Sequence, residues 1–176
     1  PRWKMNTHNF GWFKGDTVNL GVGQGYLSAT PIQLAYYSAI LANKGTINKF
    51  SFVKKDSLGE PDKLISSNID VSDWEKMHES MIGVIDNPKG TAGRLRSLKD
   101  YTIAAKSGTV ELVSTETKED YKIIRENEGN RDHAIIIAFG PMPNPEYAVS
   151  VVIENGESGG SVAGPVAIAV MNSLIN

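Results

Sequence analysis

The sequence predicts an α+β fold in which an antiparallel sheet of three strands is packed by helices. Two observations support this class. Segments whose apolar residues recur at helical spacing come early in the chain and again at its end, and three β-prone runs lie between them. The 176 residues make up about one domain, which is long enough to bury a core.

Residues 1–29 are rich in glycine and asparagine and show no helical period, so we predict an irregular ordered loop with short extended pieces. The first helix is predicted to follow Thr30 as the N-cap, with Pro31 in its first position and Gln33 completing a capping box. Gly45 is predicted to end this helix. Its predicted buried stripe is Ile32, Ala35, Tyr36, Ala39 and Ile40.

A strand around Phe50 and Phe52, followed by a polar loop, is predicted for residues 46–68. The second helix is predicted to begin near Ser72, with Glu75 as its capping partner. Its predicted buried stripe is Trp74, Met77, Met81 and either Val84 or Ile85. The glycine- and proline-containing turn cluster at 86–94 precedes a short predicted helix that contains Leu95 and Leu98.

The three strands are predicted at residues 101–112, 133–141 and 146–155. The highly charged segment 113–132 is predicted to be an exposed, mobile connection. A short hairpin-type turn, "PMPNPE", joins the second strand to the third. The last element is an apolar helix that is predicted from about Pro165 to Ile175.

Composition excludes several classes of function. The formal net charge is −2, and charges of both signs are interspersed, so no basic face for nucleic acid is predicted. The absence of cysteine excludes disulfide scaffolds, thiolate zinc sites and cysteine nucleophiles. His8, His78 and His133 are isolated from one another, and we predict neither a metal site nor another cofactor. No apolar run approaches the roughly 18 residues that a membrane helix needs.

Three short motifs match catalytic signatures without the context that those signatures need. The GxSxG match at 156–160 is followed by no Asp, Glu or His, so it cannot be the nucleophile turn of an esterase, and we predict a flexible glycine loop. Ser51 and Lys54 match SxxK, but the surrounding residues alternate as in a strand, which places the two side chains on opposite faces. Residues 66–68 match SxN, a pattern that is common in polar loops.

The tetrapeptide Lys106-Ser107-Gly108-Thr109 is unusual because it interrupts an apolar strand with small and charged residues. A lysine facing a cleft offers a positive charge to a substrate carboxylate, and Ser107 adds a hydroxyl group beside it. Gly108 would let an extended peptide lie along the strand, and the Thr109 N–H could stabilise an oxyanion. The alternative is an exposed edge strand whose lysine prevents aggregation. The tetrapeptide alone leaves both interpretations open.

A resemblance to a known protein family distinguishes between these two interpretations of the tetrapeptide. The segments "GDTVNLGVGQGYLSATPIQLA" (15–35), "PKGTA" (88–92), "IAAKSGTVEL" (103–112), "RDHAIIIAFGP" (131–141) and "YAVSVVIENG" (147–156) resemble class B penicillin-binding proteins of the elongation type. The resemblance implies the serine β-lactamase/D,D-peptidase-like fold. It also implies a peptidoglycan D,D-transpeptidase, which crosslinks stem peptides through an acyl-serine intermediate and is a target of β-lactams.

The resemblance assigns catalytic or substrate-binding roles to four residues. Lys106 and Ser107 would bind the terminal carboxylate of the substrate or of a β-lactam. Thr109 would provide its amide to the oxyanion hole and help to hold the same carboxylate, and Gly108 would allow its close approach. Asp16, like the glutamines of the first segment, is expected to be structural.

The whole chain, 1–176, is expected to be the C-terminal portion of a single transpeptidase domain. In the family both SxxK and SxN lie upstream of the "GDT" segment, so the nucleophile is not expected in this chain, and the chain alone should be inactive. The chain opens with Pro1 and has no signal peptide or anchor, which also indicates part of a longer protein. Strands beside 147–155 are expected to come from the upstream part.

The resemblance also implies partners and a location. The partners are stem peptides ending in D-Ala-D-Ala, β-lactam antibiotics, a SEDS-type glycan polymerase and elongation-complex proteins, and the location is the periplasmic face of the bacterial inner membrane. Two alternatives stay open: a serine β-lactamase or β-lactam sensor, and a catalytically silent scaffold of the same fold. The "GDT" and "GQG" segments argue against the first alternative.

Overall fold

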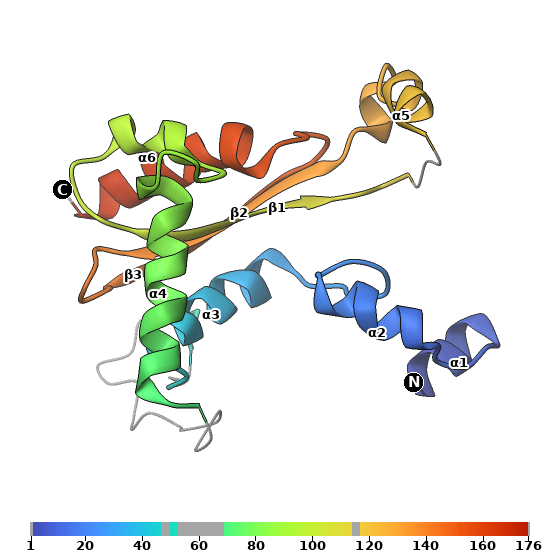
Figure 1. Cartoon of the computed structure of the whole chain (residues 1–176), viewed down its shortest axis with the longest axis horizontal. Coiled ribbons are helices and arrows are strands. Elements are labelled where there is room, and N and C mark those ends of the chain that lie inside the picture. The colour runs from blue at the N-terminus through green and yellow to red at the C-terminus, as the bar shows by residue number, and fades with distance from the viewer. Residues whose placement is uncertain (1, 47–49, 53–68, 114–116, 176) are drawn as a thin grey trace. The chain divides into compact units, whose positions relative to one another are not determined.

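The computed structural model describes residues 2–46, 50–52, 69–113 and 117–175 (Figure 1). They belong to two compact units, Pro1–Thr30 and Pro31–Asn176. The predicted strand of 46–68 lies mostly outside the described residues, and the described residues 46 and 50–52 are not in a strand. Lys54 of the SxxK match and the SxN match at 66–68 also lie outside them.

The first unit contains two helices, α1 (Arg2–His8) and α2 (Lys14–Gly21), where the sequence predicted an irregular loop. That prediction was wrong because polar contacts, and not an apolar stripe, hold these helices. Asp16, in the first turn of α2, accepts a hydrogen bond of 2.7 Å from the N–H of Phe13, as in a capping box. Glycines with positive φ, Gly23 and Gly25, follow α2.

Lys4 is the buried centre of this unit, with a side chain that is only 2% exposed. Its ammonium donates a hydrogen bond of 2.5 Å to Asp16 and lies 4.6 Å from the ring centroid of Phe13 and 4.9 Å from that of Tyr26. The hydrogen bond from Lys4, and then that from the N–H of Phe13, lower the pKa of Asp16. The structural role expected for Asp16 is therefore observed.

Replacing Asp16 with asparagine is expected to destabilise the first unit at pH 7 and to have little effect near pH 2. A carboxyl group whose pKa is lowered in the folded state stabilises it above the unfolded pKa of about 4, and this contribution is lost as the pH falls through the folded pKa. The indole N–H of Trp12, which donates to Thr17 at 2.8 Å, gives an NMR signal that follows this unit alone. An equal loss at both pH values would contradict the expectation.

The second unit is built on a sheet with the order β1-β2-β3, all antiparallel, as predicted. Its strands are β1 (Ala104–Val110), β2 (His133–Gly140) and β3 (Tyr147–Ile153). In the register, Lys106 is opposite Ile137, which is opposite Ser150. Successive side chains point to opposite faces, so each strand contributes to both sides of the sheet.

Helices cover both faces of this sheet (Figure 1). On one face, α6 (Gly164–Ile175) packs through Ala167, Ile168 and Met171 against Ala105 and its neighbours, near the position predicted for the last helix. On the other face, α3 (Pro31–Ala42) and α4 (Val71–Asp86) pack against an apolar group that includes Ala104, Ile137 and Phe139. The fold is the predicted α+β arrangement of an antiparallel sheet packed by helices.

Helix α3 begins at Pro31 as predicted, and Gly45, with φ of 83°, donates to the carbonyl of Ile40 at 2.9 Å beyond its end. The predicted buried stripe is only partly correct. Ile40 is buried, but Ile32 is 46% exposed, and Ser38 is fully buried because its hydroxyl donates to the carbonyl of Ala138 at 2.9 Å. The capping box of Thr30 and Gln33 stays a prediction.

Helix α4 begins close to the predicted position, but Asp70 is its N-cap residue. Glu75 is not at the capping-box position that was predicted, because the third residue after the N-cap Asp70 is Asp73. The Glu75 carboxylate lies 3.7 Å from the Lys44 ammonium. Met81 and Ile85 are buried as predicted. His78 is also buried, and its Nε2 lies 2.8 Å from the carbonyl oxygen of Leu41, so this histidine belongs to the core.

The connections contain more structure than predicted. The turn cluster leads into η1 (Gly93–Leu98), the short helix that was expected, with Leu95 buried. In the segment predicted to be an exposed connection, 113–132, the structure places α5 (Lys118–Ile124) and η2 (Glu128–Asn130). Thr117 caps α5 by accepting a hydrogen bond from the N–H of Asp120, a local signal that the charge-based prediction did not weigh.

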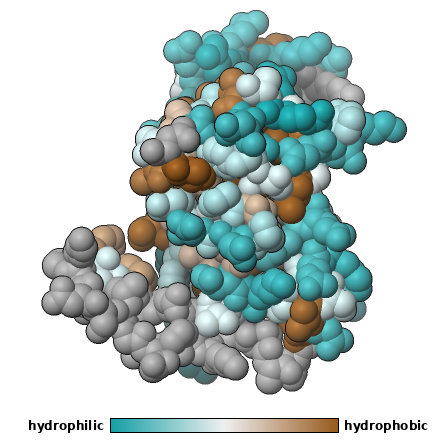
Figure 2. Space-filling view, turned by 90° about the vertical axis from the view of Figure 1, so that its left-hand side faces the viewer, coloured by the Kyte–Doolittle hydropathy of each residue, from teal (hydrophilic) through white to brown (hydrophobic). Residues whose placement is uncertain are grey.

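The exposed surface mixes polar and apolar side chains. On the face shown in Figure 2, hydrophobic residues form separate groups among hydrophilic ones. Val166, Val170 and Leu174 are exposed on α6 at a spacing of four residues, so the outer side of this helix is apolar. Within the described ranges, no helix combines the length and the apolar character that crossing a membrane would require.

Candidate active site

Strand β1 carries the four predicted site residues. Lys106 is on the face of the sheet that α4 covers, together with Ala104, whereas Ser107 is on the opposite face with Ala105. Lys106 and Thr109 are exposed, and Ser107 and Gly108 are half-buried. The Lys106 ammonium donates to the carbonyl of Ser107 at 2.5 Å.

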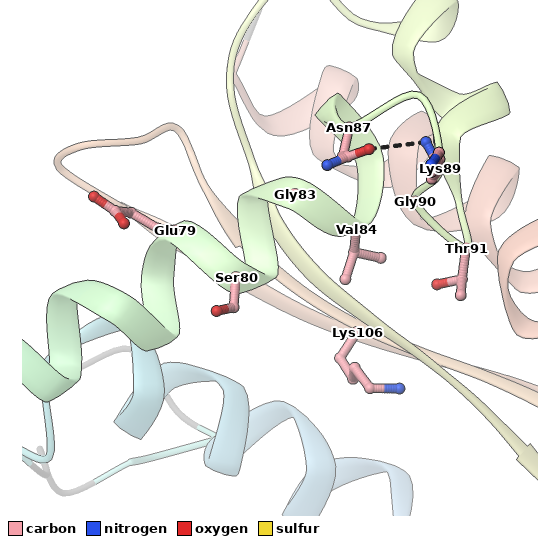
Figure 3. A pocket seen from close by; sticks show the side chains of 9 residues that line it. All are labelled: Glu79, Ser80, Gly83, Val84, Asn87, Lys89, Gly90, Thr91 and Lys106. Carbon is pink, nitrogen blue, oxygen red and sulfur yellow. Dashed lines mark hydrogen bonds between the residues drawn. The ribbon is translucent and has the colours of Figure 1, made fainter.

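A cavity of about 600 Å³ lies beside Lys106 (Figure 3). Lys106 and the end of α4 line it together with the turn that follows this helix: Glu79, Ser80, Gly83, Val84, Asn87, Lys89, Gly90, Thr91 and Lys106. The Ser80 hydroxyl donates to the carbonyl of Lys76 at 2.7 Å, so its proton is used within its own helix. Lys106 therefore lines a cavity, although its side chain is exposed.

The turn after α4 is held tightly against the helix. Asn87 accepts a hydrogen bond of 2.9 Å from the N–H of Lys89, and Ala92 donates to the carbonyl of Val84 at 3.0 Å. A Cβ atom on Gly90 would lie 2.3 Å from that carbonyl oxygen, so only glycine fits there. This turn fixes the position of the next residue, Thr91.

Thr91 is the residue that sequence reasoning missed. Its hydroxyl lies 3.0 Å from the hydroxyl of Ser107. Thr91 belongs to the turn after α4, whereas Lys106 and Ser107 belong to β1, so two distant segments of the chain meet at this site. The "PKGTA" segment contributed to the resemblance, but nothing in its spacing indicated which residue it would contact. Only the folded turn reveals this pair.

Gly108 and Thr109 contact the segment that precedes α6. The hydroxyl of Thr109 donates to the carbonyl of Glu157 at 3.3 Å. A Cβ atom on Gly159 would lie 2.1 Å from the carbonyl oxygen of Ile135 and 2.5 Å from that of Gly108. A Cβ atom on Gly108 itself would meet Ile135 at an ordinary 3.7 Å, so packing among the described residues does not require this glycine.

The GxSxG match is therefore not the flexible loop that was predicted. Gly159 and Gly160 are buried in η3 (Gly159–Ala163), a π-helical turn that leads into α6. A Cβ atom on Gly160 would lie 2.6 Å from the carbonyl oxygen of Thr91. The two glycines allow η3 to approach both β1 and the turn after α4, and this close packing explains their presence.

The far end of β1 is joined to α5 through Asp132. This carboxylate is buried, and it accepts hydrogen bonds from the hydroxyl of Tyr121 and, at 3.4 Å, from the N–H of Leu112. The hydrogen bond to Asp132, together with burial, raises the pKa of Tyr121. Among the described residues, no group of three or more His, Asp or Glu side chains could hold a metal ion.

Chemically, the arrangement is suited to binding an anion. Because one of the paired Thr91 and Ser107 hydroxyl groups donates to the other, the Lys106 ammonium and one hydroxyl group can donate hydrogen bonds to an anion. A carboxylate is one of the anions that such charge-assisted donors bind well. The model of the penicillin binding protein transpeptidase domain matches residues 3–172. The chain belongs to the penicillin-binding protein transpeptidase family. This confirms the family and the fold that the sequence predicted.

Curated members of this family are similar over nearly the whole chain. The peptidoglycan D,D-transpeptidase MrdA of Haemophilus influenzae is 34% identical over 99% of this chain and 28% of its own length. The MrdA of Acinetobacter baumannii is 38% identical over 93% of this chain and 25% of its own length. The chain thus spans about a quarter of the length of these relatives.

Solved structures agree with this assignment. PBP2 of Pseudomonas aeruginosa, in complex with WCK 5153, is 36% identical over 98% of this chain and 35% of its own, with a TM-score of 0.75. PBP2 of Helicobacter pylori, in a complex with MreC, is 28% identical over 99% of this chain and 30% of its own, with a TM-score of 0.78.

Proposed function

We propose that residues 1–176 are the C-terminal portion of a single penicillin-binding transpeptidase domain, and that the intact protein is a serine-type peptidoglycan D,D-transpeptidase. The single observation that supports this most is the cavity that Lys106 and Thr91 line in a penicillin-binding family member, with the Ser107 hydroxyl 3.0 Å from that of Thr91. In this proposal Lys106 and Ser107 bind the terminal carboxylate of the stem peptide. Gly108 leaves room for the peptide, and Thr109 directs its N–H to the oxyanion.

The reaction proceeds in two steps. A serine of an SxxK motif, upstream of this chain, attacks the carbonyl carbon of the penultimate D-Ala. The bond to the terminal D-Ala breaks, and the proton from the serine hydroxyl passes to the leaving amine. An amine of a neighbouring stem peptide then attacks the acyl-serine, which forms the crosslink and restores the serine hydroxyl. The residues of β1 position the substrate in both steps and stabilise the oxyanion.

Partners and location follow from the same proposal. The substrates are stem peptides that end in D-Ala-D-Ala, and β-lactams bind as their mimics. Because a PBP2 relative forms a complex with MreC, we include elongation-complex proteins among the partners. We propose a SEDS-type glycan polymerase as a further partner on the resemblance alone. The domain would act on the periplasmic face of the bacterial inner membrane, where its substrate is.

Labelling with a fluorescent penicillin tests this function. The protein that contains this chain together with the upstream serine is expected to form a stable covalent adduct, whereas residues 1–176 alone should stay unlabelled. Replacement of the SxxK serine by alanine is the control and should abolish the adduct. Rapid release of the label would indicate a β-lactamase, and the lack of any adduct in the longer protein would indicate a catalytically silent scaffold.

A further inference from the structure

Thr91 contacts the candidate site through its side chain, and the proposed function gives this side chain no chemical role. Its hydroxyl lies 3.0 Å from that of Ser107, which is 16 positions away in the sequence. Thr91 also lines the cavity beside Lys106, and Figure 3 shows the two side chains reaching it from different segments. Thr91 is therefore placed between the cavity and a residue that is expected to bind the substrate.

The backbone around Thr91 is held from two directions. On one side, the N–H of the fully buried Ala92 donates to the carbonyl of Val84 in α4 at 3.0 Å. On the other side, η3 packs so closely that a Cβ atom on Gly160 would lie 2.6 Å from the carbonyl oxygen of Thr91. The Thr91 side chain thus begins at a fixed point, and its contact with Ser107 is part of the packing.

Ser107 is fixed as well, because it lies inside β1, where it is opposite the buried Ile136. Its carbonyl accepts a hydrogen bond of 2.5 Å from the Lys106 ammonium. An ammonium has three protons, so this contact leaves two of them for an anion. The Ser107 hydroxyl, in contrast, has one proton, and the direction of that proton decides whether Ser107 can bind a carboxylate.

A bound carboxylate determines the direction of the hydrogen bond between the two hydroxyl groups. An ionised carboxylate can only accept, so a Ser107 hydroxyl that binds it must donate its proton to it. The Thr91 hydroxyl must then donate to the Ser107 oxygen across the 3.0 Å contact. Hydrogen bonds in such a chain polarise one another, so a hydroxyl that accepts one becomes a stronger donor. The proton of Thr91 therefore supports the bond from Ser107 to the anion and does not compete with it.

We propose that Thr91 is a positioning residue for Ser107, whose hydroxyl it holds in the direction that presents the Ser107 proton to the substrate carboxylate. This inference rests on the proposed function, since it assumes that Ser107 binds that carboxylate. Thr91 acts through Ser107 and does not itself touch the substrate. Without the Thr91 hydroxyl, the Ser107 hydroxyl loses the donor that orients it, so recognition of the carboxylate should weaken while the fold and the nucleophile are kept.

The test uses the longer transpeptidase and two thioester substrates that carry a D-alanyl acyl group. In one the leaving group ends in a carboxylate, and in the other a methyl group, which accepts no hydrogen bond, replaces this carboxylate. Thr91→Val is expected to lower the rate of acylation by the first substrate about two- to tenfold, the range for one neutral hydrogen bond, and to leave the rate with the second unchanged. Thr91→Ser keeps the hydroxyl and should react with both substrates at the parent rate.

A double-mutant cycle tests whether Thr91 acts through Ser107. Once Ser107→Ala has removed the acceptor, Thr91→Val should cause no further loss with the first substrate, whereas losses that multiply would show that the two residues act independently. Ser97→Ala is the control for losing an exposed hydroxyl. The Ser97 hydroxyl donates to the carbonyl of Arg94 at 3.4 Å and does not line the cavity, so both substrates should react at the parent rate.

Two results with a folded Thr91→Val variant would refute the positioning role: equal losses with both substrates, or the parent rate with the first. A parent protein that fluorescent penicillin does not label would instead refute the proposed function and, with it, this inference. If Thr91→Val does not fold, as followed by circular dichroism, Thr91→Ala removes the same hydroxyl and gives the same comparison.

Discussion

Replacing Lys106 with methionine is expected to lower the rate at which the longer transpeptidase is acylated by a penicillin by about 10- to 10²-fold. Methionine keeps the apolar stem of the side chain and removes the ammonium of this cavity-lining residue. A hydrogen bond to a charged group contributes about 1.5–3 kcal/mol, and this range corresponds to the expected loss. The second-order rate constant of labelling by fluorescent penicillin measures it.

The control for this variant is Lys76→Met. Lys76 is an exposed lysine on α4 whose ammonium lies 2.9 Å from Asp73, and it does not line the cavity. This variant should react at the parent rate. If Lys106→Met also reacted at the parent rate, Lys106 would be an edge-strand lysine and not a ligand of the carboxylate, which is the alternative that the tetrapeptide alone left open.

Replacing Gly159 with alanine is expected to cause the largest loss of stability, on the order of 3 kcal/mol. The added Cβ atom would lie 2.1 Å from the carbonyl oxygen of Ile135 and 2.5 Å from that of Gly108. Both are backbone atoms, so no side chain can rotate away, and η3 must move from the sheet. Denaturant unfolding followed by circular dichroism measures the change in the free energy of unfolding.

Gly83→Ala is the matched control for this loss. Gly83 lies inside α4, and the nearest atom to an added Cβ would be the Cβ of Asn87 at 4.0 Å. Here alanine should stabilise the protein by about 0.5–1 kcal/mol, because it favours the helix and meets no close contact. A Gly159→Ala variant as stable as the parent would show that η3 does not require its close approach to β1.

The strands and the last helix could be predicted from the sequence because their signals are local. A continuous run of apolar, β-prone residues in 133–141, and a turn rich in proline before 146–155, are sufficient to predict two antiparallel strands. The same reasoning failed at residues 1–29 because the buried residue there is Lys4, a charged side chain that a search for apolar spacing ignores. It failed in part at α3 because Ser38 is buried through a hydrogen bond to Ala138, which lies 100 residues away.

Local chemistry made Lys106, Ser107, Gly108 and Thr109 recognisable in the chain, because small and charged residues are unexpected in an apolar strand. Their surroundings could not be recognised in the same way. Thr91 meets Ser107, and Glu157 meets Thr109, only after α4, η3 and the sheet have packed together. Contacts between distant segments leave no periodic pattern in the sequence, so the partners of the candidate site emerge only from the folded chain.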